Sequence, residues 1–150
     1  MPQSFGSLYF HLIFSTKNRL PLLSDDIQPR LFEYLGGILR NQKGVLIAAG
    51  GIEDHVHLLV SLSRQASIAD TLRDLKSNSS GWIHETFPEL RLFAWQSGYG
   101  AFSVSFSAFK SVRRYLANQR EHHQKRSFKE EFLEILKLHE MGYDERYVWD

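Results

Sequence analysis

The chain has no cysteine, and only four prolines and two methionines stand among its 150 residues. Without cysteine there are neither disulfides nor thiolate ligands, so any bound metal must be held by nitrogen and oxygen donors. No apolar run approaches the ~20 residues that a membrane-spanning helix requires. Met1 is followed by neither a basic nor an apolar leader. We therefore expect a soluble, cytoplasmic protein with no membrane partner.

Apolar and charged residues are present in ordinary amounts. Hydrophobic residues make up 43% of the chain and charged residues 23%, as in globular proteins. The net charge of +1 is almost neutral, but its distribution is uneven: between positions 110 and 129 seven lysines and arginines stand beside one acid, Glu121. Such a segment suits the phosphates of a nucleic acid, and it equally suits a solvated helix face.

The hydrophobic periodicity predicts the order β-α-β-β-α-β followed by two further helices. The expected strands are residues 8–14, 45–49, 55–60 and 93–107, and the expected helices are residues 27–40, 67–87, 108–123 and 127–139. Gly50 and Gly51, together with the acidic pair Glu53 and Asp54, are predicted to form a hairpin turn. This order is that of the ferredoxin-like fold, in which two helices cover one face of an antiparallel sheet. We predict one α+β domain over residues 1–150, with a core at about 8–123 and an added C-terminal helix and tail at 127–150.

His55 and His57 are the first candidates for chemistry. They are two apart on an expected strand, so their imidazoles should lie side by side on one face of the sheet. Two neighbouring imidazoles make half of a metal site, although such a pair taken alone is more often structural. Asp54 is expected to point to the other face of the sheet and to be a poor ligand.

Tyr115 and Gln119 are the second pair of candidates. They are four apart on an expected helix and should share one of its faces. The Gln119 side chain offers a carbonyl oxygen for a hard cation, and the Tyr115 hydroxyl is a possible nucleophile. Arg113 and Arg114 lie nearby and are expected to favour the phenolate by lowering its pKa. Taken alone, both residues would pass as solvated surface side chains.

Together the two pairs resemble a known family. The segment Glu53-Asp-His-Val-His-Leu-Leu59 and the segment Tyr115-Leu-Ala-Asn-Gln119 are similar to the motifs of the single-tyrosine transposases of the histidine-hydrophobic-histidine (HUH) superfamily. This group comprises the IS200-like transposases of insertion sequences and their repeat-element-associated relatives. The stretch from Trp95 to Phe102 also resembles the strand that precedes the tyrosine helix in this family. The likeness covers roughly residues 8–119.

The resemblance implies a DNA transposase that cleaves and rejoins single-stranded DNA, most often at hairpin ends, through a 5′-phosphotyrosine intermediate. It makes Tyr115 the catalytic nucleophile, and it makes His55, His57 and Gln119 the ligands of Mg²⁺ or Mn²⁺. It also implies a homodimer with shared active sites, although the sequence leaves open whether the tyrosine helix acts in cis or in trans. His122 and His123 lie just beyond the motif and could compete as ligands.

The basic segment is expected to contact DNA. Its candidate residues are Lys110, Arg113, Arg114, Arg120, Lys125 and Arg126. Two other functions remain open from the sequence. A metal-dependent phosphodiester hydrolase would activate water and would form no covalent link to the protein. A non-catalytic single-stranded nucleic-acid-binding module is suggested by Gly98-Tyr-Gly-Ala-Phe-Ser-Val104, which is close to an RNA-recognition consensus.

Overall fold

The computed structural model describes residues 2–150. Four strands form one antiparallel sheet in the order β2-β3-β1-β4, with bounds β1 Tyr9–Ser15, β2 Val45–Ile52, β3 His55–Ser61 and β4 Gly100–Val104. The helices are α1 Gln28–Asn41, α2 Ile68–Thr86, α3 Phe109–Ala117, α4 Gln119–His122 and α5 Phe128–Leu138. The predicted α+β fold with a ferredoxin-like order and additional C-terminal helices is confirmed. None of these helices, within the described residues, is long and apolar enough to cross a membrane.

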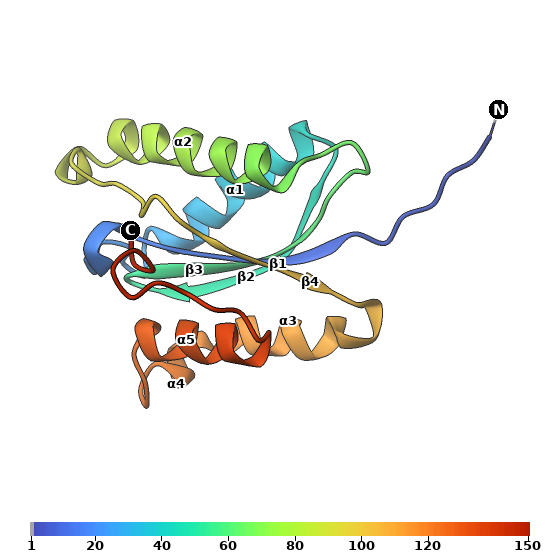
Figure 1. The fold of residues 1–150 in the computed structure, drawn as a ribbon. Helices are drawn as coiled ribbons and strands as arrows, with labels where there is room; N and C mark the ends of the chain where they lie inside the picture. The colour runs from blue at the N-terminus through green and yellow to red at the C-terminus, as the bar shows by residue number, and fades with distance from the viewer. Residues whose placement is uncertain (1) are drawn as a thin grey trace.

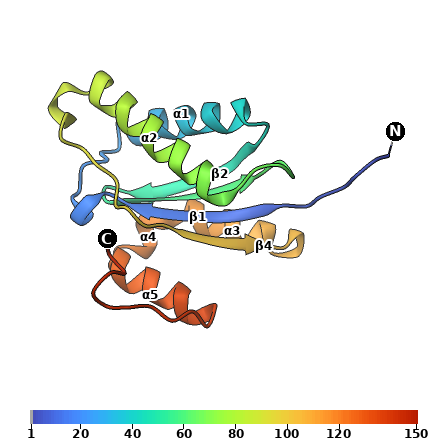
Figure 2. The same ribbon diagram turned by 45° about the horizontal axis from the view of Figure 1, so that its top comes forward.

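The sheet separates two layers of helices. Helices α1 and α2 cover one face, and α3, α4 and α5 lie against the other (Figures 1 and 2). Because side chains alternate along a strand, β3 serves both layers. Val56 and Leu58 are fully buried in the core beneath α1 and α2, whereas His55 and His57 point toward α5 on the opposite face.

The predicted turn is confirmed at its acidic pair, because the chain reverses at Glu53 and Asp54. Gly50 and Gly51 are not part of the turn, because both lie within β2. A Cβ atom on Gly50 would lie 1.9 Å from the carbonyl oxygen of Leu116, which belongs to α3. Only glycine permits so close an approach of two backbones. Gly50 therefore allows α3, the helix that carries Tyr115, to pack directly against the sheet.

The single helix predicted for residues 108–123 is wrong in one respect, because it breaks at Asn118. Asn118 has φ −104° and ψ 21°, outside the helical region, and its backbone N–H donates to the carbonyl of Tyr115. Helix α3 ends at Ala117 and the short α4 begins at Gln119. Gln119 is 2% exposed at the start of α4, so the amide that follows the break lies inside the protein.

The last strand is shorter than predicted, because only Gly100–Val104 pairs with β1. The residues before it belong to no strand and meet the sheet edge at an isolated bridge between Thr16 and Trp95. Trp95 instead packs its ring edge-on against Phe14, with 4.7 Å between the ring centroids. Burial of this large apolar side chain in the core competes with continued strand pairing at this end of the sheet.

Candidate active site

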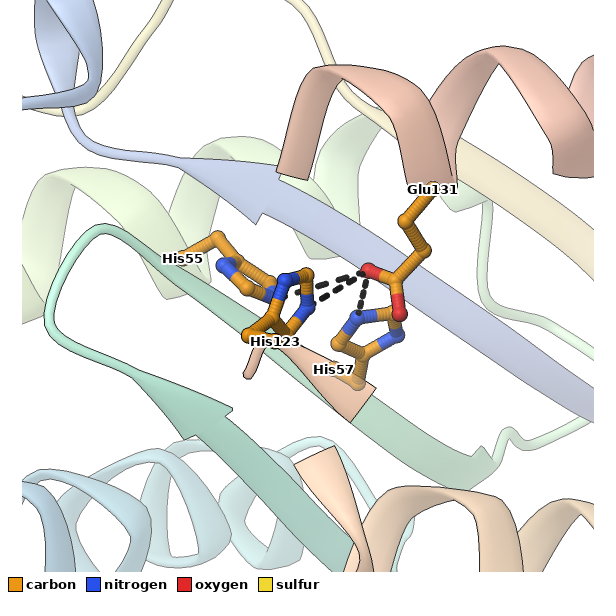
Figure 3. Close-up of side chains that lie close together, drawn as sticks. All are labelled: His55, His57, His123 and Glu131. Carbon is orange, nitrogen blue, oxygen red and sulfur yellow. Dashed lines mark hydrogen bonds and ion pairs between the residues drawn. The ribbon is translucent and has the colours of Figure 1, made fainter. Parts of the chain in front are cut away.

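Four metal-ligating side chains meet on the face of the sheet that α3, α4 and α5 cover. His55 and His57 come from β3, His123 directly follows α4, and Glu131 comes from the first turn of α5 (Figure 3). One ligand atom from each lies within 4.8 Å of the others. The side chains of His55, His57 and Glu131 are fully buried and that of His123 is 3% exposed. One strand and two C-terminal helices that follow it by more than sixty residues thus build one buried polar cluster.

Each imidazole turns its Nε2 atom into the cluster and is held from behind at Nδ1. The Nδ1 partners are the Asp54 carboxylate at 2.7 Å for His55, the Arg126 carbonyl at 2.8 Å for His123, and His11 Nε2 at 2.8 Å for His57. Metal-bound histidines are oriented in this way by outer hydrogen bonds. Asp54 is, as expected, no part of the cluster itself, but it orients His55.

Gln119 and Tyr115 complete the site. The Gln119 Oε1 atom lies 3.0 Å from His55 Nε2 and 3.1 Å from His123 Nε2, and its Nε2 atom donates to Glu131 Oε2 over 3.2 Å. The hydroxyl of Tyr115 donates to the same Glu131 oxygen. The structure therefore brings together all four residues that the two sequence motifs single out.

The hydrogen-bond chemistry of the cluster fits a bound cation. His55 and His123 face oxygen acceptors at Nδ1, so in the neutral form that a metal requires each ring would present its Nε2 lone pair to the cluster. Those lone pairs face the oxygens of Gln119 and Glu131, which are acceptors as well. Exchanging the oxygen and nitrogen of the Gln119 amide would give the two imidazoles a donor. It would also place the amide oxygen against Glu131 Oε2, so that two acceptors would again face each other. Converging lone pairs of nitrogen and oxygen are the donor set of a divalent metal.

The ionisation states of His57 and Glu131 also suit metal binding. Burial lowers the pKa of His57 to about 4, although a hydrogen bond to Glu131 partly opposes this, so the ring is neutral at pH 7. Burial alone would raise the pKa of Glu131. Hydrogen bonds with His123 and His57, together with that from Tyr115, hold it well below its usual range. A neutral imidazole and an ionised carboxylate are the forms that bind metal ions.

Tyr115 is protonated in this arrangement. Burial, and after it the Glu131 carboxylate, raise the pKa of the phenol above its ordinary value. The expectation that Arg113 and Arg114 lower this pKa is wrong, because both side chains are exposed and the cation that acts on Tyr115 is Arg126. Glu131 is therefore the acceptor that holds the proton of the phenol in place.

Glu131 is the site residue that the sequence reasoning missed. It lies on α5 between Phe128 and Phe132, both of which are buried. An acid on the apolar stripe of an amphipathic helix is a signal that could have identified it, because such a position faces the interior. His123, expected only as a competing ligand, is placed in the cluster, whereas His122 stacks on Tyr115 with 4.7 Å between ring centroids.

The predicted DNA-contacting residues divide into two groups. Within residues 2–150, four are exposed and form no ion pair, namely Lys110, Arg113, Arg114 and Lys125. The other two are engaged internally. Arg120 pairs with Asp25 and Glu53, and Arg126 pairs with Glu134. The RNA-recognition-like stretch offers no base-stacking ring at Phe102, which is 5% exposed in β4.

Several known proteins are similar to this chain in sequence or in fold. A family model described as "Transposase IS200 like" matches residues 4–119. The ISDra2 transposase TnpA of Deinococcus radiodurans is 28% identical over 117 residues, which cover 75% of this chain and 84% of the relative. A crystal structure of a Deinococcus radiodurans R1 protein assigned as a transposase has a TM-score of 0.64 at 29% identity, covering 79% of this chain and 98% of that one. The structure of a REP-associated tyrosine transposase bound to a REP hairpin has a TM-score of 0.60 at 13% identity, covering 82% and 73%.

The ferredoxin-like sheet with its added helices is the fold of a tyrosine transposase, and the polar cluster lies on the face that carries Tyr115. The class is therefore that of the transposases. Since the family model spans most of its length, the chain belongs to the IS200-like transposase family. The family predicted from the two sequence motifs is confirmed.

Proposed function

We propose that the protein cleaves and rejoins single-stranded DNA through a 5′-phosphotyrosine intermediate, with Tyr115 as the nucleophile. One observation carries this proposal. The Tyr115 hydroxyl donates to Oε2 of Glu131, while Oε1 of the same carboxylate lies 2.9 Å from His57 Nε2 and 3.2 Å from His123 Nε2. A phosphodiester bound there would meet the nucleophile and a preorganised polar site together.

The chain's own groups account for the movement of the proton. Tyr115 begins as a phenol, so it must lose its proton as its oxygen bonds to phosphorus. Glu131 Oε2 already accepts the hydrogen bond from that hydroxyl and is the base in reach. As the P–O3′ bond breaks, the O3′ atom leaves and takes a proton from solvent. Rejoining is the reverse step, in which a 3′-hydroxyl attacks the phosphotyrosine and the phenol regains its proton.

The proposed metal set is larger than the predicted one of His55, His57 and Gln119. We add His123 Nε2 and Glu131 Oε1, because the same cluster includes them. Of the two expected ions, Mn²⁺ suits three imidazoles better, since Mg²⁺ prefers oxygen ligands and keeps its waters. A bound ion would supply polarisation of the phosphate and neutralisation of its charge.

We propose single-stranded DNA with a hairpin as the partner, by analogy with the relative that binds a REP hairpin. The four unpaired cations Lys110, Arg113, Arg114 and Lys125 would contact its phosphates, and Arg120 and Arg126 would contribute less because acids already neutralise them. Such a substrate agrees with the cytoplasmic location expected from the sequence.

We propose that the tyrosine helix acts in cis, because the Tyr115 hydroxyl reaches Glu131 and the Gln119 amide reaches His55 within the same chain. The homodimer stays a prediction, and it need not share active sites. Residues 127–150 are proposed to belong to the same working domain as the core, because α5 supplies Glu131 to the cluster.

The test is covalent capture of DNA. A pool of single-stranded oligonucleotides, each with one hairpin and randomised flanks, is incubated with protein and Mn²⁺ and analysed under denaturing conditions. We expect an adduct that Tyr115→Phe abolishes and that Tyr34→Phe leaves intact, since Tyr34 stacks on Trp82 in α2, away from the cluster. Cleaved ends without an adduct would indicate the hydrolase instead. Metal-independent binding of RNA, unchanged by His57→Ala, would indicate the binding module.

A further inference from the structure

A cleft of about 310 Å³ opens between α3 and α5 beside the Tyr115 hydroxyl. Val112 from α3 and Ile135 and Leu138 from α5 form its apolar walls, and Tyr115 and Glu131 also line it. Leu138 is 74% exposed, an unusual position for a large apolar side chain at the rim of a polar site. The proposed chemistry gives the cluster a role but assigns none to this cleft.

We propose that this α3–α5 cleft receives one unpaired base of the nucleotide next to the scissile phosphate, an inference that rests on the proposed function. A nucleobase has flat apolar faces and a polar edge, which match apolar walls with a polar rim. The cleft adjoins the Tyr115 hydroxyl, so its occupant must lie within one nucleotide of the attacked phosphorus.

The charges around the cleft distinguish a base from a phosphate as its occupant. Two carboxylates, Glu131 and Glu134, line the cleft together with one cation, Arg126, which pairs with Glu134. One carboxylate is left without a cation, so an anionic phosphate would be repelled there. Further cations lie outside the cleft on α3, where Lys110 and Arg114 are exposed, and no acid occurs between positions 90 and 120. The strand's phosphates are therefore held along α3 while the neutral base turns into the cleft.

The rim of the cleft can also read the edge of the base. His139 donates from Nδ1 to the carbonyl of Ile135 over 2.9 Å, which leaves its Nε2 atom available to contact the base. Its ring is held against Phe102, with 4.5 Å between ring centroids. Ser111 adds an exposed hydroxyl on the α3 side. A polar atom on a fixed ring favours those bases whose edge places a hydrogen-bond partner opposite it.

The assignment gives α5 two linked tasks. Its Glu131 holds the Tyr115 proton, and one turn further Ile135 forms the wall of the cleft. A base seated in the cleft would therefore fix the same helix that orients the nucleophile. Binding of the flanking base would therefore be coupled to positioning of Tyr115 through α5.

The experiment sequences the DNA that becomes covalently attached. Adducts formed with Mn²⁺ and hairpin oligonucleotides with randomised flanks are isolated, and base frequencies are read at each position around the linked phosphate. We expect one adjacent position to show a bias among the four bases. Ser111→Trp, which fills the mouth of the cleft, should reduce this bias roughly tenfold, about the effect of losing one base contact. Leu138→Ala should reduce it less.

Leu92→Ala is the matched control, because Leu92 is a leucine exposed to 90% and does not line the cleft. It should keep the wild-type bias. Adducts without any bias, or a bias that Ser111→Trp and Leu138→Ala both leave unchanged, would overturn the cleft assignment while the phosphotyrosine chemistry stands. A wild-type protein that forms no adduct would overturn the proposed function, and the cleft assignment with it. Thermal unfolding of each variant identifies any that fails to fold, and Leu138→Ala, a truncation at an exposed position, then decides the outcome.

Discussion

The two faces of the sheet differ in what they bury. Beneath α1 and α2 lies one continuous apolar core that includes Leu12, Leu58 and Leu72. Beneath α3 to α5 the apolar contacts are split into two smaller groups, one around Ile13 and one around Leu59, with the histidine cluster also on this face. The same strands serve both faces through their alternation. One face of the sheet therefore carries the stability and the other carries the chemistry.

The face of the sheet beneath α3 to α5, called here the polar face, is organised by hydrogen bonds between side chains rather than by apolar packing. Among the described residues, no buried side-chain nitrogen or oxygen lacks a hydrogen-bond partner. A buried polar group without a hydrogen-bond partner costs more free energy than one hydrogen bond contributes. Such a network is therefore stable only when every member has a partner. This difference predicts that variants on the two faces fail in different ways.

Leu58→Ala should have the largest effect on stability. Leu58 is fully buried in the core beneath α1 and α2, and its truncation leaves a cavity that costs about 2–5 kcal/mol of unfolding free energy. Denaturant titration measures the loss. Under conditions where the variant is folded, its affinity for Mn²⁺ should equal that of the wild type. A large loss of metal affinity in the folded variant would show that the two faces are not separable.

Lowering the pH should reduce the free energy of unfolding through groups on the face beneath α3 to α5 alone. Burial lowers the pKa of His11 to about 3 and that of His57 to about 4. Both rings therefore take up a proton more readily in the unfolded chain than in the folded protein. For a lowered histidine pKa, stability is complete above the unfolded value of 6.5 and is lost as the pH falls toward the folded value, by up to about 1.4 kcal/mol per pH unit. His123 opposes this, because its raised pKa adds stability that is present at low pH and lost as pH rises.

The metal-free protein should therefore become less stable between pH 6.5 and about 4. Denaturant midpoints measured in the presence of a chelator test this. His11→Phe removes one of the two contributing groups and should make the decline shallower. A midpoint independent of pH over this range would contradict the burial of neutral rings.

Asp54→Ala should have the smallest effect, and it should fall on metal binding rather than on folding. Asp54 touches no other member of the cluster but fixes His55 through its Nδ1 atom. Loss of such an outer partner reduces metal affinity about tenfold. Isothermal titration with Mn²⁺ measures the change, and Asp26→Ala, an exposed acid without an ion pair among residues 2–150, is the control. Equal Mn²⁺ affinities in the two variants would show that Asp54 does not contribute to metal binding.

Much of this arrangement could be predicted from local patterns. The pairing of His55 with His57 follows from strand alternation, and the shared face of Tyr115 and Gln119 follows from helical spacing. Both patterns depend on neighbours within four residues. The two pairs meet because α1 and α2 of the βαββαβ unit cover one face of the sheet, and α3 and α4, which follow this unit, cover the other (Figure 1).

The remainder depends on contacts between distant residues. Glu131 meets His57 across 74 positions, and its own surroundings suggest only a helix start capped by Ser127. The role of Gly50 depends on the backbone of Leu116 and has no local sign, so a turn was the natural prediction. The break at Asn118 also follows from tertiary packing, because asparagine carries only a small penalty inside a helix.

The most direct test asks whether the imidazoles of the cluster bind one cation in the absence of DNA. Electron spin-echo envelope modulation of Mn²⁺ bound to the purified protein detects nitrogen ligands directly. The account predicts imidazole nitrogen couplings in the wild type that weaken in His57→Ala and again in His123→Ala. Bound Mn²⁺ with water couplings alone, or nitrogen couplings that both variants leave unchanged, would contradict it.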